Sequence, residues 1–197
     1  MKIKISDIIT DALITNGVVR QEDGELYKYG IKYGLLMVIN VLTFILIGYF
    51  LGMLWHSIIF MMSYIPFRTY AGGYHASTEL RCYVLSCSLI TIVLIGIKNI
   101  PWNGYVCLLM SLLAAIIVIW LAPVEALNKP LREPERTIYR KKSRILLFIL
   151  LCAAILLWFE GSRQYSVSII AASDVVAVML VIGSIKNGRV RLESEDD

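Results

Sequence analysis

Between residues 33 and 185 the sequence is a series of long apolar runs with short polar breaks. After a first run over residues 33 to 66, the later runs cover about 82–97, 104–122, 144–159 and 165–185. Apolar runs of this length are typical of helices that cross a bilayer, where every backbone polar group must be satisfied internally. The 197-residue chain is 58% hydrophobic and only 17% charged, unlike ordinary soluble domains. We therefore predict an all-α integral membrane protein.

The first run is too long for one span and rather short for two. Its 34 residues would extend roughly 50 Å as a single helix, whereas the hydrocarbon core is about 30 Å thick. A pair of short or tilted helices that turns near residues 48 to 55 fits this length better. With the four later runs, the prediction is six transmembrane helices.

The distribution of Lys and Arg tests this count, because cytoplasmic loops are enriched in both. Six spans place 17 of the 19 basic residues on one side and leave only Lys98 and Arg163 opposite, whereas five spans give at best 12 against 7. We therefore predict one membrane-embedded domain over residues 1–197. It has a six-span core over 33–185 and a cytoplasmic tail over 186–197, and both termini are cytoplasmic.

The N-terminal segment, residues 1–30, begins with an amphipathic pattern. Ile5, Ile8 and Leu13 share one helical face that lacks Asp7 and Asp11. Such a helix either lies on the membrane surface or packs on the cytoplasmic face of the protein itself. We see no apolar core or cleavage site of a removable signal peptide.

Several functional classes lack sequence support. The cysteines at 82, 87, 107 and 152 have no spacing typical of a metal site or a disulfide framework, and we expect core packing for the last three. No basic stretch is interleaved with aromatic residues as in nucleic-acid binding. We expect no metal, no cofactor and no nucleic-acid partner.

The polar stretch over residues 66–82, PFRTYAGGYHASTELRC, contains a histidine and a cysteine close together. On one continuous helix His75 and Cys82 would be about 10 Å apart along the axis, too far for proton transfer. We therefore expect a helix to begin between them, with Ser77 or Thr78 as its N-cap and Cys82 in its second turn.

A glycine pair in the same stretch would bring the two side chains together. Gly72 and Gly73 let the loop fold back, so that His75 reaches Cys82. The helix N-terminus and Arg81 would favour the thiolate. The prediction is a catalytic Cys-His dyad; the alternative is a packing cysteine and a histidine that anchors the loop.

The motif R-x-x-x-G-G-x-H-x-x-x-x-x-x-C between apolar spans resembles the accessory gene regulator B (AgrB) family. The matching positions are Arg68, Gly73, His75 and Cys82, and APVEALNKPL over residues 122–131 matches a second stretch. The resemblance implies a cysteine endopeptidase in the bacterial cell membrane. Such an enzyme converts a short precursor peptide into a cyclic quorum-sensing signal. It also implies a homodimer.

Arg68 and Lys129 each have two possible roles. Arg68 would bind a substrate carboxylate or an oxyanion, or anchor the chain at the membrane interface. Lys129 lies in a loop with seven basic residues between 129 and 144, which would hold an acidic tail of the precursor or simply orient the protein. A third catalytic residue stays open between Glu79, Glu125 and Asn128.

Asp174 supports a rival function. An ionisable side chain within an apolar run is costly, and it commonly marks an ion or proton pathway or pairs with a polar group such as Asn40. The rival is a small transporter or channel that uses Asp174, and a non-catalytic membrane adaptor is a third class. A reactive thiol at residue 82 would discriminate these from the peptidase.

Overall fold

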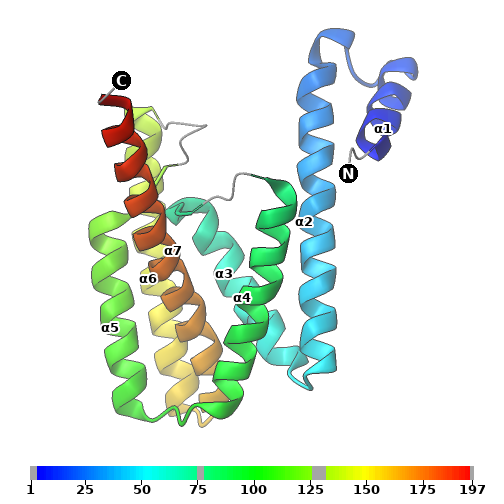
Figure 1. The fold of residues 1–197 in the computed structure, drawn as a ribbon. Coiled ribbons are helices and arrows are strands. Elements are labelled where there is room, and N and C mark those ends of the chain that lie inside the picture. Colours follow the sequence, from blue (N-terminus) through cyan, green and yellow to red (C-terminus); the bar gives the residue numbers. More distant parts are fainter. Residues whose placement is uncertain (1–3, 75–77, 126–131, 196–197) are drawn as a thin grey trace. The chain divides into compact units, whose positions relative to one another are not determined.

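A computed structural model describes residues 4–74, 78–125 and 132–195 of the chain. These residues form seven α-helices and one short 3-10 helix, and no strand is present among them (Figure 1). The predicted all-α class is confirmed. The chain divides into two compact units, Met1–Thr43 and Phe44–Asp197, with the division inside the second helix.

The first unit contains α1 (Lys4–Thr15), the 3-10 helix η1 (Gln21–Asp23) and the first part of α2 (Gly24–Phe50). The Lys28 ammonium of α2 forms an ion pair with the Asp7 carboxylate of α1 at 2.9 Å. Ile5 and Ile8 on α1 are exposed within the structure. The helix is therefore present where the pattern predicts it, and its position on a membrane surface stays a prediction.

The first apolar run forms two helices, as its length predicts. After α2 ends at Phe50, Gly52 makes the turn with φ +68°, and α3 (Leu54–Ala71) begins. The Ser57 hydroxyl of α3 donates a hydrogen bond to the Phe44 carbonyl of α2 at 2.8 Å. Of the two predicted options, short or tilted, α2 is not short, since it begins at Gly24 and has 27 residues.

The other helices are α4 (Glu79–Asn99), α5 (Gly104–Leu121), α6 (Glu133–Phe159) and α7 (Arg163–Glu195). Thr78 caps α4 and Asn103 caps α5, because each side chain accepts a hydrogen bond from a backbone N–H of the first turn. Most of the basic stretch between residues 129 and 144 is helical and not a loop, because α6 begins at Glu133. Pro134 lies in the first turn of α6, where proline is compatible with a helix.

Five helices, α2, α4, α5, α6 and α7, are long and apolar enough to cross a membrane. This fits a multi-pass membrane protein. Among the helices described, α3 is not one of the five, and it contains His56, Pro66 and Arg68. The count of six spans and the cytoplasmic orientation of the termini therefore stay predictions.

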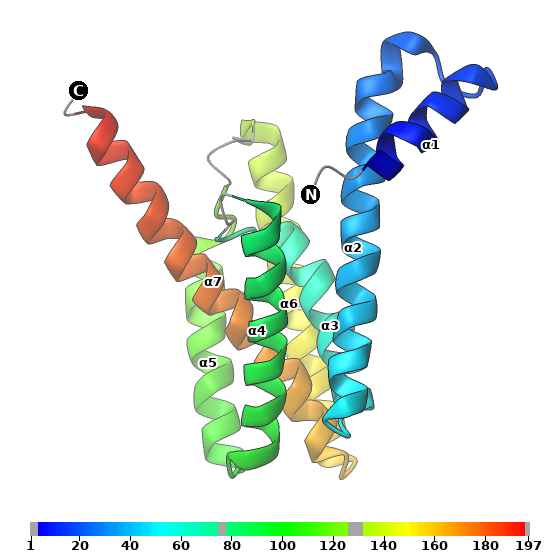
Figure 2. The ribbon, with the colours of Figure 1, turned by 45° about the vertical axis from the view of Figure 1, so that its right-hand side comes forward.

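In the second unit, α7 packs against α3, α4, α5 and α6, and it runs obliquely across them (Figure 2). Its buried residues Val176 and Leu180 join Phe67 of α3, Val118 of α5 and Leu147 of α6 in one apolar core. Because α7 contacts each of these helices, it is the element on which the loops at their ends can be fixed.

Candidate functional site

Backbone hydrogen bonds fix the segment that follows α3. The Gly73 N–H donates to the Val124 carbonyl at 3.0 Å, and the Val124 N–H donates to the Ala71 carbonyl at the same distance. The Tyr74 N–H donates to the Met179 carbonyl of α7 at 2.9 Å. The backbone leading to His75 is therefore held by two segments distant in the sequence.

The glycine pair allows this close approach. Gly72 has φ +75° and Gly73 has φ +116°, a region that other residues rarely adopt. A Cβ atom on Gly72 would lie 2.1 Å from the Val124 carbonyl oxygen, and one on Gly73 would lie 2.8 Å from the Met179 carbonyl oxygen. Both glycines turn the backbone as the sequence predicts, and neither site has room for a side chain.

A third glycine completes the contact, and the sequence interpretation missed it. Gly183 is buried in α7, and a Cβ atom there would lie 2.7 Å from both the Gly73 carbonyl carbon and the Tyr74 nitrogen. The loop can therefore reach Met179 only because residue 183 of α7 has no side chain. The only available signal was a glycine inside an apolar helical run, which often marks close packing.

Arg68 lies under the loop that precedes His75. Its Nη2 donates a hydrogen bond to the Tyr74 carbonyl oxygen. Its Nη1 is buried without a hydrogen-bond partner among the described residues, and it would lie 2.7 Å from a Cβ atom on Gly73. The half-buried Arg68 thus directs its guanidinium against the loop.

Cys82 is exposed in the first turns of α4, whereas the chain's other cysteines are half-buried or buried. Its N–H donates to the Thr78 carbonyl at 3.0 Å, so the helix begins between His75 and Cys82 as predicted.

Four residues singled out in the sequence lie outside the described part of the chain: His75, Ser77, Asn128 and Lys129. The structure shows how the chain is held on both sides of His75. The Tyr74 N–H donates to the Met179 carbonyl of α7, and Thr78 caps α4.

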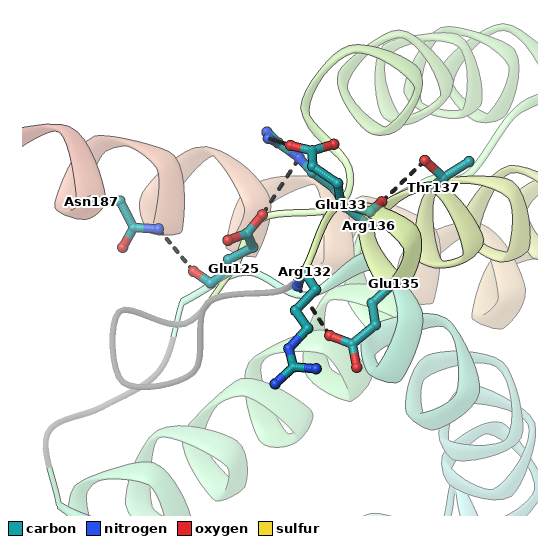
Figure 3. Close-up of polar contacts among 7 residues, drawn as sticks. All are labelled: Glu125, Arg132, Glu133, Glu135, Arg136, Thr137 and Asn187. Carbon is teal, nitrogen blue, oxygen red and sulfur yellow. Dashed lines mark hydrogen bonds and ion pairs between the residues drawn. The ribbon is translucent and has the colours of Figure 1, made fainter.

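Glu125 joins the second matching stretch to α6 and α7. Figure 3 shows the Asn187 amide of α7 directed at the Glu125 carbonyl oxygen, to which it donates at 2.8 Å. The Glu125 carboxylate forms an ion pair with the Arg136 guanidinium at 3.4 Å. This candidate third catalytic residue is thus held at the beginning of α6.

Basic side chains gather beside the loop. The Lys186 ammonium of α7 lies 4.9 Å from the centre of the Tyr74 ring, and the Lys142 ammonium of α6 lies 4.7 Å from that of Tyr70. These two cations come from different helices but flank aromatic residues of the same chain segment. An anionic peptide would be attracted to this side of the bundle.

Asp174, the residue of the rival function, is partly buried in α7, and its Oδ2 has no hydrogen-bond partner among the described residues. Its proposed partner Asn40 donates to the Leu36 carbonyl within α2. Within the described ranges, no three His, Cys, Asp or Glu side chains are grouped closely enough to hold a metal ion.

Comparisons with known proteins agree with the resemblance. A model of the family described as Accessory gene regulator B matches residues 6–182. An AgrB-like protein of Listeria welshimeri is 29% identical over 83% of this chain and 81% of its own length. The Accessory gene regulator protein B of Staphylococcus intermedius is 26% identical over 64% and 60%. An AgrB-like protein of Clostridium acetobutylicum is 21% identical over 89% and 84%. No solved structure matches the chain.

Proposed function

Since the chain belongs to the accessory gene regulator B family, we propose that it is a membrane cysteine endopeptidase that converts a small precursor peptide into a cyclic quorum-sensing signal. The observation that carries the proposal is the position of Cys82. It is the exposed cysteine of the chain, and it follows a loop whose backbone is fixed up to the residue before His75.

In this proposal the Cys82 sulfur attacks a backbone carbonyl carbon of the precursor. His75 takes the thiol proton and later gives it to the leaving amine, so that the peptide bond breaks and an acyl-thioester remains on Cys82. A side-chain thiol or hydroxyl of the same peptide then attacks the thioester. The product is a macrocyclic thiolactone or lactone, and the free Cys82 thiol is regenerated.

Arg68 has a positioning role in this scheme. Its guanidinium donates to the carbonyl of Tyr74, the residue bonded directly to His75. A hydrogen bond from a charged group is stronger than a neutral one. Arg68 would therefore orient the histidine through the backbone, and it would leave the substrate carboxylate to other basic groups.

The partners follow from the same proposal. The precursor peptide is the substrate, and the transmembrane helices lie in the lipid bilayer. Catalysis takes place on the cytoplasmic side. Lys129 and the basic beginning of α6 would attract an acidic tail of the precursor. A homodimer is implied by the family resemblance, and no role for nucleic acid is proposed.

The test is cleavage of a candidate precursor peptide by the purified protein in liposomes. Cys82→Ala and His75→Ala should each abolish cleavage and leave insertion intact, because each removes a step of one proton-coupled attack. The matched control is Cys87→Ala, which changes a half-buried cysteine of the same helix and should retain activity. Cleavage by Cys82→Ala at a rate near wild type would refute the proposal.

The unpartnered carboxylate oxygen of Asp174 favours one second candidate, a transporter or channel. Its test is ion or proton flux through the same liposomes, with Asp174→Asn as the variant. Flux that depends on Asp174 and persists in Cys82→Ala would support the transporter.

A further inference from the structure

A second site lies at the other end of the second unit. A pocket of about 400 Å³ is lined by residues from the turn between α2 and α3, from α3, the end of α4, the connection to α5 and the beginning of α7. The polar side chains at its wall are His56, Lys98, Trp102, Arg163 and Gln164. Lys98 is sixteen residues from Cys82, which is about 24 Å along α4. The pocket is therefore separate from the proposed peptidase site.

The charge of this pocket is unusual for the chain. Lys98 and Arg163 are the two basic residues that the six-span topology places apart from the other seventeen, and both line this one pocket. His56, one of only two histidines in the chain, adds an imidazole that can form a hydrogen bond with a ligand. None of the described lining residues is acidic. Lys98 and Arg163, which are 65 positions apart in the sequence, thus lie at the same pocket.

Among the described residues, no carboxylate compensates the charges of Lys98 and Arg163. Neither Lys98 nor Arg163 makes an ion pair with a carboxylate of the described residues. Glu160, the acidic residue nearest to Arg163 in the sequence, does not line the pocket. Because like charges around one cavity repel each other, a bound anion would stabilise this arrangement.

Aromatic contacts position Arg163 and His56 before any ligand arrives. The Arg163 guanidinium lies 5.2 Å from the centre of the Trp158 ring, and the His56 ring lies 5.4 Å from that of Tyr165. The Trp102 indole donates to the Gly96 carbonyl at 3.3 Å. A preorganised site loses less conformational entropy on binding.

The surroundings indicate what carries the anion. Trp158, on which Arg163 lies, also lines a second pocket of about 400 Å³ between α5, α6 and α7. That pocket is walled mainly by apolar side chains such as Leu108, Leu112 and Ile155. Tryptophans at the ends of membrane helices are typical of the level of the lipid headgroups. An anion site next to an apolar pocket at that level fits a phosphate group that is attached to an acyl chain.

We propose that the pocket around Lys98 and Arg163 binds the phosphate of an anionic phospholipid headgroup, with one acyl chain in the neighbouring apolar pocket. Arg and Lys both bind phosphate, and the guanidinium can donate two parallel hydrogen bonds to its oxygens. A zwitterionic headgroup would bring its own cation toward the two basic side chains. An anionic headgroup such as phosphatidylglycerol should therefore be preferred.

The experiment uses the full chain in a neutral detergent. Short-chain phosphatidylglycerol, short-chain phosphatidylcholine and inorganic phosphate are titrated separately, and bound copies are counted by native mass spectrometry while Tm is followed. We expect phosphatidylglycerol to bind at least tenfold more tightly than phosphatidylcholine and to raise Tm. Equal binding of the two lipids would overturn the proposal. So would a rise in Tm produced by inorganic phosphate alone at the same concentrations, because the site would then hold a free anion.

Matched variants locate the binding. The double variant Lys98→Gln and Arg163→Gln changes two exposed side chains, and it should lose at least tenfold in affinity for phosphatidylglycerol. The control removes two exposed charges from α6, with Arg140→Gln and Lys141→Gln, and should bind as wild type does. Lys98→Arg should retain binding. If both double variants lose affinity equally, binding is only general charge attraction and the pocket is not a site.

Discussion

Gly183 of α7 faces Gly73 so closely that a Cβ atom on Gly183 would lie 2.7 Å from the Gly73 carbonyl carbon. The two glycines are 110 positions apart, and neither has room for a methyl group. Their contact lets the Tyr74 N–H reach the Met179 carbonyl of the helix. The segment that precedes the proposed catalytic histidine is therefore built on α7, an element from the opposite end of the chain.

The first prediction concerns this contact. Gly183→Ala should lower precursor cleavage by at least tenfold, because the methyl group would push the loop away from α7 and move His75. Overpacking of this kind costs about 1 to 3 kcal/mol. The control is Gly188→Ala on the same helix, where no atom lies within 4 Å of the added Cβ. That change should keep full activity, since alanine favours a helix over glycine by about 1 kcal/mol. Equal activity of the two variants would show that the contact does not position the loop.

A second prediction separates the cost of positive φ from the cost of a collision. Gly72→Ala places a Cβ atom 2.1 Å from the Val124 carbonyl oxygen, whereas Gly161→Ala, with φ +89°, meets open space. Gly161→Ala should lower stability by only about 1 to 2 kcal/mol and leave cleavage unchanged. Gly72→Ala should abolish cleavage and lower Tm further. The two variants are compared by thermal unfolding in detergent and by the cleavage assay, and a Tm equal for both would contradict the collision.

A third prediction tests the role of Arg68. Arg68→Lys keeps the positive charge but loses the planar guanidinium that donates to the Tyr74 carbonyl. We expect kcat to fall by about 100-fold, because a displacement of about 1 Å at a reacting group has an effect of this size. The KM for the precursor should stay near wild type, because Arg68 contacts the Tyr74 carbonyl. A large rise in KM with kcat preserved would instead assign Arg68 to substrate binding.

A fourth prediction concerns the basic segment between residues 129 and 144. Lys129→Glu should raise the KM for the precursor, with labelling of Cys82 by iodoacetamide unchanged. The effect should shrink as salt rises, because exposed charges are screened. A precursor with a charge-reversed tail should partly restore binding. Normal cleavage by the variant at every salt concentration would mean that the segment acts only as a topology signal.

The sequence by itself determined the helical membrane class, the division of the first apolar run into two helices, and the break between His75 and Cys82 where Thr78 caps α4. These features are local, since apolar run length, glycine and capping residues act within a few turns of the chain. It also carried the motif through which the family is recognised.

The tertiary structure alone decided which segments hold the loop. Gly183, Met179 and Val124 have no local signal that pairs them with Gly73, because a backbone hydrogen bond or a close approach depends on how distant helices pack. The same holds for Lys98 and Arg163, which the sequence marked only as two exceptions in charge. They line one pocket because the ends of α4 and α7 meet there, and helix packing, not sequence spacing, sets that meeting.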